Sequence, residues 1–128
     1  MTKRPDQHTT GLLRSFGYAF EGIAQTFEGR NFRIQLGAAV VVIIACMVLR
    51  VQAWAWCAVL VCVGMVLGAE AANTAIEALV DLASPQVHPL AKRAKDCAAA
   101  AALLCALVSV GVGAVVFGPY LLSMFGLM

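Results

Sequence analysis

The chain has 128 residues, of which 62% are hydrophobic and 12% are charged, and its formal net charge is +2. A soluble domain of this length buries too small a fraction of its surface to hide so much apolar area. This composition therefore excludes an ordinary soluble domain and indicates one compact unit embedded in a membrane.

The N-terminal region divides into a polar tail and an amphipathic segment. Residues 1–10 are polar, so we expect a frayed tail and no cleavable signal peptide. In residues 12–27 the apolar side chains recur at helical spacing, while Arg14, Glu21 and Gln25 lie elsewhere on the helix. A helix of this kind beside membrane spans usually lies in the headgroup layer. We therefore predict an amphipathic surface helix over residues 12–27.

Three longer apolar segments follow, over about residues 32–50, 53–83 and 92–117. Each is long enough to cross the hydrocarbon core as a helix. Gly118 and Pro119 close the third segment, and we expect its helix to end there. The sequence thus predicts a single all-α integral membrane domain, with three transmembrane helices and the N-terminal surface helix.

The distribution of basic residues predicts the orientation of these spans. Eight of the nine Lys and Arg residues lie either before residue 34 or between residues 92 and 95. With three spans, these two regions fall on the same side of the membrane. By the positive-inside rule that side is the cytoplasm, so we expect a multi-pass protein with a cytoplasmic N-terminus.

One polar face stands out on the second predicted span. Its members recur at spacings of three, four and four residues, which places them on the same side of a helix: Glu70, Asn73, Glu77 and Asp81. Aligned carboxylates repel each other unless positive charge lies among them. The following segment supplies Lys92, Arg93 and Lys95. Carboxylates that face a basic segment at a membrane boundary indicate a site for a metal-bound polyphosphate.

Glu70 is expected at or just inside the edge of the hydrocarbon layer. An acidic side chain costs roughly 2.5–3.5 kcal/mol at full depth on insertion scales, and less near the interface. Two interpretations remain open for it. It is either a structural residue that hydrogen-bonds between helices, or a general base that takes a proton from a hydroxyl group arriving through lipid.

The polar residues that follow Glu70 are candidates for metal binding. Mg²⁺ prefers hard oxygen ligands and takes only one or two protein carboxylates besides substrate phosphates. Glu77, together with Glu28 from the end of the surface helix, would meet that demand. Asp81 is a possible supporting residue, and its alternative is a solvated helix face. Asn73 either donates to a phosphate, orients Glu77 or forms a hydrogen bond between helices.

The segment before the third span holds candidates for phosphate binding. Lys95 is disfavoured by the dipole near a helix N-terminus, which makes a phosphate contact more credible. Asp96 is either a helix-capping residue or a nucleotide contact. His88 either contacts a nucleotide or holds the loop in place. The motifs GxxxxGK[ST] and GxGxxG do not occur, so a phosphotransferase here would rely on metal, carboxylates and lysine.

The stretch EAANTAIEALVDLASPQVHPLAKRAKDCAAAAALL resembles the prokaryotic diacylglycerol kinase family. That family's motif reads approximately E-x-x-N-x-A-I-E-x-x-x-D, followed by H and A-K-D. The upstream stretches RSFGYAFEGI and NFRIQLGAA extend the resemblance over about residues 10–118. Within the family, SPQVHPLAKRAKD is most similar to the undecaprenol kinase branch. The resemblance implies a homotrimer in the bacterial inner membrane that phosphorylates a membrane lipid alcohol with ATP and Mg²⁺.

The resemblance also implies roles for individual residues. Glu70 becomes the general base and Glu77 a metal ligand. The implied nucleotide and phosphate contacts are Asn73, Gln86, His88, Lys95 and Asp96, together with Arg14 and Tyr18 on the surface helix. One position departs from the family pattern, because the metal-binding Glu expected three residues before Phe32 is replaced by Gly29. We expect Glu28, one residue earlier, to take that role.

These observations predict a lipid kinase whose acceptor is undecaprenol, and diacylglycerol is the alternative acceptor. A small transporter that uses Glu70 as a proton or cation site is a second interpretation, although it would not need Lys95 or Asp96. A non-catalytic assembly subunit is a third. We expect no nucleic-acid partner.

We also expect a homo-oligomer from the position of the polar face. A lone chain of three spans is not expected to enclose Glu70 and Asn73 and also to leave a cleft for ATP and a lipid, and a carboxylate facing lipid is costly. Small residues at 69, 72, 75 and 98–102 favour close approach of helices. The prediction is therefore an oligomer with sites completed between chains, and the family resemblance implies a trimer.

Overall fold

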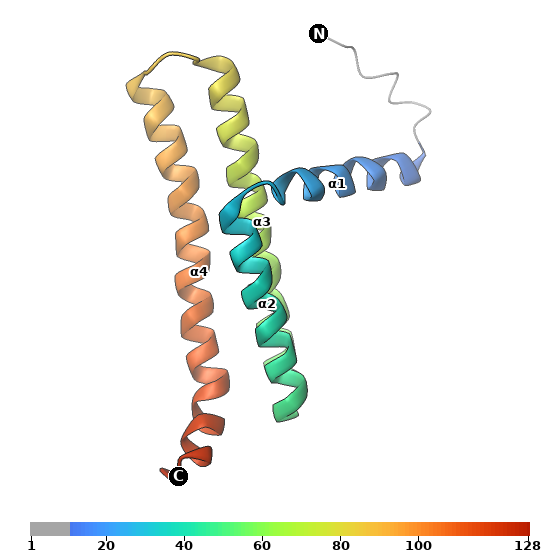
Figure 1. Ribbon diagram of the computed structural model, residues 1–128, viewed down its shortest axis with the longest axis vertical. Helices are drawn as coiled ribbons and strands as arrows, with labels where there is room; N and C mark the ends of the chain where they lie inside the picture. The colour runs from blue at the N-terminus through green and yellow to red at the C-terminus, as the bar shows by residue number, and fades with distance from the viewer. Residues whose placement is uncertain (1–10) are drawn as a thin grey trace.

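The computed structural model describes residues 11–128, and the predicted tail over residues 1–10 lies outside them. The described part contains four helices and no strand: α1 (Leu12–Thr26), α2 (Arg30–Leu49), α3 (Ala53–Ala83) and α4 (Pro89–Met124). Figure 1 shows α2, α3 and α4 running side by side, while α1 lies crosswise to them. This arrangement confirms the all-helical prediction and the separate surface helix.

The three long helices α2, α3 and α4 are long and apolar enough to cross a membrane. Large apolar side chains remain exposed along them, for example Val41, Leu60, Leu104 and Val108. A soluble protein would be destabilised by so much exposed apolar surface, whereas lipid tails solvate it. The described chain is therefore a membrane protein with three transmembrane helices.

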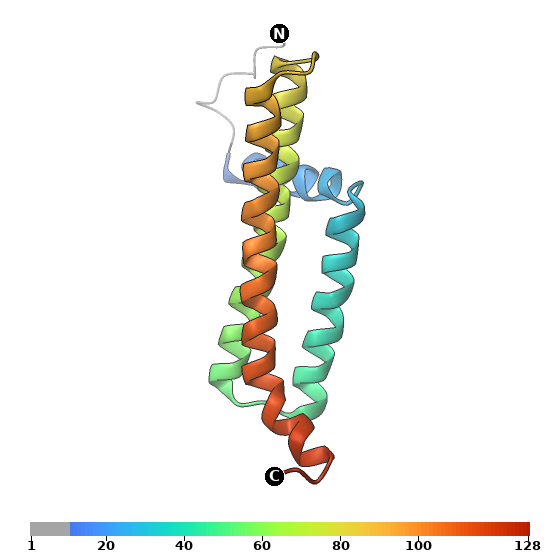
Figure 2. The same ribbon diagram turned by 90° about the vertical axis from the view of Figure 1, so that its left-hand side faces the viewer.

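The helices α3 and α4 form a long antiparallel hairpin with the most extensive packing in the structure, and α2 packs on α3 (Figure 2). Ala98 and Ala102 on α4 are both buried. Their small side chains allow α3 and α4 to approach closely. Part of the small-residue pattern that suggested packing between chains is thus used within one chain.

The apolar core lies toward the end of the bundle away from α1. Its buried members are Cys46, Val51, Ala55, Val59 and Val116. Arg50 closes α2 in the left-handed conformation, with φ of 51°, and the Val51 amide donates to the Cys46 carbonyl at 3.2 Å. This is a common way to end a helix. The sharp reversal lets Val51 turn inward and lets α3 begin within three residues.

The bounds of α4 differ from the sequence prediction at both ends. The helix begins at Pro89, because His88 caps it and proline suits the first helical position. The predicted end at residue 117 is wrong, since α4 passes through Pro119 and ends at Met124. Proline removes one backbone hydrogen bond and bends a helix, and membrane helices tolerate this. Figure 2 shows the last turns of α4 bending away from its axis.

Candidate active site

The polar face of α3 begins at two side chains buried within a single chain. Glu70 and Asn73 are each only 7% exposed. The antiparallel pairing of α3 with α4 places buried Ala102 at about the level of Asn73. A single chain therefore buries both side chains without a neighbour. The expectation that it cannot do so and also leave a cleft for ATP and a lipid stays a prediction. A trimer remains a prediction from the family resemblance.

Asn73 holds the next carboxylate of the face. Its Nδ2 donates a hydrogen bond to Oε1 of Glu77 at 3.2 Å, one turn along α3. Of the roles considered for Asn73, orienting Glu77 is the one seen here. The Asn73 Oδ1 atom is buried and has no hydrogen-bond partner within residues 11–128. A buried amide oxygen without a partner is costly, so a donor group brought to this atom would relieve that cost.

Asp81 and Lys95 join the two helices of the hairpin. The Lys95 ammonium group forms an ion pair with the Asp81 carboxylate across the gap between α3 and α4. Both side chains remain partly exposed, at 40% for Lys95 and 66% for Asp81. Asp81 is thus more than a solvated carboxylate, because it holds Lys95 against the acidic face of α3.

Asp96 does not cap α4. It lies two turns beyond the cap residue His88 and forms an ion pair with Lys92, four residues earlier on the same helix. The capping interpretation depended on a helix that starts near residue 92. It is wrong because the helix begins at Pro89. Asp96 therefore faces solvent beside Lys92, where a nucleotide can reach both.

The loop between α3 and α4 is organised by short-range hydrogen bonds. His88 caps α4 by accepting a hydrogen bond at Nδ1 from the Leu90 amide at 3.1 Å. The Ser84 hydroxyl donates to the carbonyl of Gln86 at 2.9 Å. His88 therefore has the loop-holding role in this structure, and its other ring nitrogen takes no part in the cap. The side chains of Gln86 and His88 are exposed.

The three candidates from the N-terminal region make no polar contact with this group within the described part of the chain. Glu28 is exposed in the turn between α1 and α2, and Gly29 precedes α2 in an ordinary extended conformation. The N-terminal half of α1, which carries Arg14 and Tyr18, projects away from the hairpin (Figure 1). Among residues 11–128, no hydrogen bond or ion pair links these three side chains to the α3 face.

The sequence model named prokaryotic diacylglycerol kinase matches residues 17–117. The chain belongs to this family. It is therefore a membrane lipid kinase, which uses ATP to phosphorylate a lipid, and the interpretations of the chain as a transporter or as a non-catalytic subunit are wrong.

Relatives in this kinase family differ in their named acceptor. A diacylglycerol kinase of Synechocystis sp. is 42% identical over 97% of this chain and 72% of its own length. An undecaprenol kinase of Bacillus subtilis is 38% identical over 86% of this chain and 90% of its own. A diacylglycerol kinase of Escherichia coli is 35% identical over 80% and 88%. The lipid alcohol is thus one of at least two kinds.

The donors on α3 of this lipid kinase suit a hard cation. No cluster of three or more His, Cys, Asp or Glu residues occurs within the described range 11–128. Mg²⁺ in nucleotide sites needs only one or two protein carboxylates, because phosphates and water complete its coordination. Glu77 is exposed and is oriented through one oxygen by Asn73, which leaves its second oxygen for a metal. These residues fit Mg²⁺.

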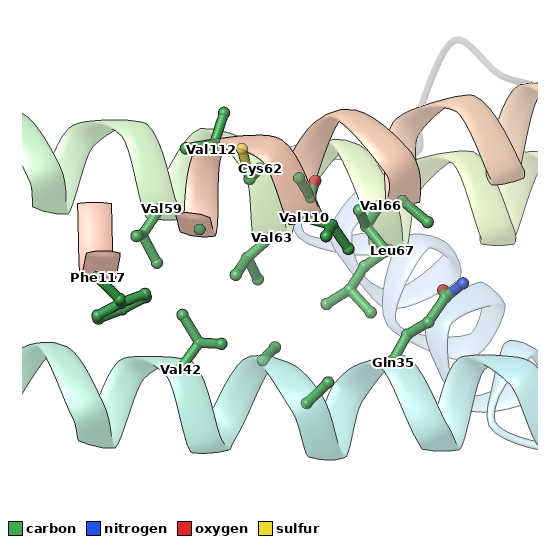
Figure 3. Close-up of a pocket in the computed structure, with 15 residues that line it drawn as sticks. Gln35, Val42, Val59, Cys62, Val63, Val66, Leu67, Val110, Val112 and Phe117 are labelled. Atoms are coloured by element: carbon green, nitrogen blue, oxygen red, sulfur yellow. The ribbon is translucent and has the colours of Figure 1, made fainter. Parts of the chain in front are cut away.

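One polar residue of the kinase was missed by the sequence reasoning. Gln35 lies on α2 and lines an apolar cavity between α2, α3 and α4, as Figure 3 shows. Its Oε1 atom is buried without a hydrogen-bond partner in residues 11–128. The available signal was a single glutamine inside the apolar stretch FRIQLGAAVV. That signal was weak because a glutamine two residues after Arg33 also suits the end of a membrane span.

Proposed function

We propose that this kinase transfers the γ-phosphate of ATP to the hydroxyl group of undecaprenol in the presence of Mg²⁺. The single observation that supports phosphoryl transfer is the polar face of α3, along which the side chains change from buried to exposed. It begins at the buried carboxylate of Glu70 and ends at the exposed Asp81, which holds Lys95. A lipid hydroxyl can approach the buried end, and a nucleotide can approach the exposed end.

Glu70 is the general base in this proposal. Its carboxylate takes the proton from the lipid hydroxyl as the hydroxyl oxygen bonds to the γ-phosphorus. The bond from that phosphorus to the oxygen bridging it to the β-phosphate breaks, and ADP leaves. Burial of Glu70 keeps water, the competing nucleophile, away from the reacting oxygen.

The exposed residues position the nucleotide. Glu77 and Glu28 would hold Mg²⁺, and Asn73 keeps Glu77 in place. When bound, the metal neutralises charge on the phosphate oxygens. The remaining contacts to phosphates and nucleoside come from a set that has exposed or partly exposed side chains: Arg14, Tyr18, Gln86, His88, Lys95 and Asp96. Asp81 supports the site by orienting Lys95.

We further propose a homotrimer in the bacterial inner membrane, with the N-terminus in the cytoplasm. The distribution of Lys and Arg supports that orientation. The projection of α1 supports sites that are shared between chains, because it takes Arg14 and Tyr18 away from their own hairpin (Figure 1).

The choice of undecaprenol rests on the loop stretch SPQVHPLAKRAKD and on the similarity to the undecaprenol kinase of B. subtilis. Diacylglycerol is the second candidate, favoured by the 42% identity to a diacylglycerol kinase. Purified protein in lipid vesicles, given ATP, Mg²⁺ and one alcohol at a time, separates the two. We expect kcat/KM to be at least about tenfold higher for undecaprenol. A higher kcat/KM for diacylglycerol would make diacylglycerol the acceptor. If neither alcohol is phosphorylated, the proposed function is wrong.

A further inference from the structure

One side-chain amide lies between the two carboxylates to which the proposed function gives different tasks. Asn73 is 7% exposed and lies on α3 between Glu70, three residues before it, and Glu77, four residues after it. Side chains at these spacings are neighbours on a helix, with Cβ atoms roughly 5–6 Å apart. The amide of Asn73 is therefore within reach of both carboxylates.

The orientation of this amide follows from its exposed neighbour. An ionised carboxylate accepts hydrogen bonds but cannot donate them, so the nitrogen of the amide has to face it. The Asn73 Nδ2 group accordingly donates to Oε1 of Glu77 at 3.2 Å. The oxygen and the nitrogen of a planar amide point in different directions, and Oδ1 is therefore turned away from Glu77.

The oxygen of the amide has no donor to bind. The Asn73 Oδ1 atom is buried and has no hydrogen-bond partner within residues 11–128. In the same range the carboxylate of Glu70, a residue that is only 7% exposed, accepts no hydrogen bond and forms no ion pair. An ionised carboxylate and an amide oxygen are both acceptors and cannot bond to each other. A proton on Glu70 changes this, because a carboxylic acid has an O–H donor.

The hydroxyl groups on α1 and α3 that lie closest in sequence to this pair do not supply the missing donor. The Thr74 hydroxyl donates to the backbone carbonyl of Glu70 at 3.0 Å. Thr26, which is buried at the end of α1, donates to the Gly22 carbonyl at 2.8 Å. Each hydroxyl has a single hydrogen and is already engaged. The protonated form of Glu70 is therefore the donor that has the right spacing for Asn73 Oδ1.

We propose that Asn73 is a positioning residue for the transferred proton, because its Oδ1 atom accepts a hydrogen bond from the protonated carboxyl group of Glu70. As the oxygen of the lipid alcohol bonds to the γ-phosphorus, its O–H bond breaks and the proton moves to a Glu70 oxygen. The bond from that phosphorus to the bridging oxygen breaks, and ADP leaves with the electron pair. The new O–H group of Glu70 donates to Asn73 Oδ1 until it returns the proton to water. This inference rests on the proposed function, since it takes Glu70 as the base.

A single amide thus serves two carboxylates that have different tasks. Its nitrogen holds Glu77, whose other oxygen is left for a cation, and its oxygen receives the proton that Glu70 has taken. A carboxylate at position 73 would lack the donor for Glu77, and an ammonium group would lack the acceptor for Glu70. An amide has both, which gives a physical reason for asparagine between the two acidic residues.

The stability of Glu70→Gln tests this contact without any measurement of activity. The Gln side chain carries an N–H donor where the protonated acid carries its O–H, so it should donate to Oδ1 permanently. We expect Glu70→Gln to unfold in detergent a few degrees above the wild type, and at least about half of this gain to be lost in the Asn73→Ala background. Thr74→Val is the matched control background and should keep the gain, because the Thr74 hydroxyl bonds to the backbone and not to the amide.

The kinetics of Asn73→Ala separate the two halves of the amide. Saturating Mg²⁺ compensates for a less well oriented Glu77, so the remaining defect reports on the loss of Oδ1. We expect kcat to be about tenfold below the wild-type value under these conditions, and Thr74→Val to retain the wild-type kcat. A lipid alcohol that is fluorinated on the carbon next to its hydroxyl-bearing carbon releases its proton more readily. With this alcohol the defect of Asn73→Ala should shrink to about threefold or less.

Two results would overturn the proposal. A role of Asn73 that is confined to Glu77 or to folding predicts the same kcat defect with both alcohols, and it predicts additive stability changes for Glu70→Gln and Asn73→Ala. If Asn73→Ala does not fold, Asn73→Leu, which has nearly the size of asparagine and lacks Oδ1, takes its place in both measurements. Failure of the proposed function is distinct from these results, because the wild-type protein itself would then phosphorylate neither alcohol.

Discussion

The Lys95 ammonium group on α4 forms an ion pair with the Asp81 carboxylate on α3. This pair joins the ends of the two helices that lead into their connecting loop. It shows which residues of α3 and α4 lie opposite each other. Because Lys95 is held on the acidic side of the hairpin before any nucleotide binds, little rearrangement is needed when a phosphate arrives.

Asp81→Asn should weaken ATP binding modestly. The amide keeps the shape of the side chain but loses the charge that orients Lys95, and both partners are partly exposed, so the effect is limited by solvent. We expect KM for ATP to rise by about two- to fivefold, with thermal stability nearly unchanged. Titrations with ATP at low and high salt will measure this, and Asp81→Glu is the charge-conserving control. A lower KM for ATP in Asp81→Asn would show that Asp81 competes with phosphate for Lys95.

Glu70→Gln should retain the fold and lose most of the turnover. The amide has nearly the same shape and places no charge in a buried position, so folding is not expected to suffer. Loss of general-base catalysis should lower kcat by about 10²–10⁴-fold, while ATP affinity changes little. Steady-state kinetics in vesicles and an ATP-binding measurement test the two parts separately. Turnover close to that of the wild type would exclude Glu70 as the base.

Glu77→Ala should mainly affect the dependence on Mg²⁺. The variant removes a hard oxygen ligand but leaves the buried end of the site intact, so the Mg²⁺ concentration for half-maximal activity should rise by at least about tenfold. KM for the lipid alcohol should stay near its wild-type value. Asn73→Ala is the companion variant, since it leaves the carboxylate in place but removes its 3.2 Å hydrogen bond. A smaller shift in the same direction is expected there, and no shift in either variant would exclude Glu77 as a ligand.

Glu28→Ala tests the departure from the family pattern at Gly29. If Glu28 is the second carboxylate ligand, its removal should raise the Mg²⁺ requirement by about tenfold, as for Glu77→Ala. Glu21→Ala is a suitable control, because Glu21 is another exposed carboxylate on the same surface helix. If the Mg²⁺ titration of Glu28→Ala overlays that of wild type, the second ligand comes from another residue.

The sequence alone predicts the helices and identifies the residues that share the polar face of α3. Apolar length predicts the spans, and the helical period places Glu70, Asn73 and Glu77 on one side of α3 without knowledge of the neighbouring helices. Local chemistry was less decisive at the ends of α4, where Pro119 bends the helix but does not end it. There the preference of proline for helix ends is overridden by the membrane, which offers no other partner to the backbone.

Tertiary relationships were not accessible to the same reasoning. The period of a helix shows which residues share a face but not which helix covers them, so the burial of Glu70 within one chain was not foreseen. The pairing of Asp81 with Lys95 depends on the length of the loop and on where α4 begins, which in turn depends on the His88 cap. Gln35 became a candidate only through the cavity that surrounds it.

The separation of Glu70 from Lys95 predicts that a working site uses more than one chain. Asp81, the partner of Lys95, lies eleven positions after Glu70 on α3, which corresponds to roughly 16 Å at 1.5 Å per residue. A base must lie within hydrogen-bond distance of the hydroxyl, and the attacking oxygen must lie roughly 3–3.5 Å from its target at the start of reaction. A lysine that is paired with Asp81, so far along the helix from Glu70, is poorly placed to contact the phosphate that the hydroxyl attacks on the same chain.

We therefore expect the base and the phosphate-binding lysine of one site to come from neighbouring chains of the proposed trimer. Glu70→Gln and Lys95→Ala should each be nearly inactive alone. In trimers assembled at random from equal amounts of both, about one quarter of the sites combine an intact Glu70 with a neighbour's intact Lys95, so activity should recover toward that fraction. A mixture of Glu70→Gln with Glu70→Gln/Lys95→Ala is the control, because no site in it has a base. If the first mixture stays inactive although crosslinking shows mixed trimers, Glu70 and Lys95 of a site lie on the same chain, and Lys95 must leave Asp81 and move toward Glu70 when ATP binds.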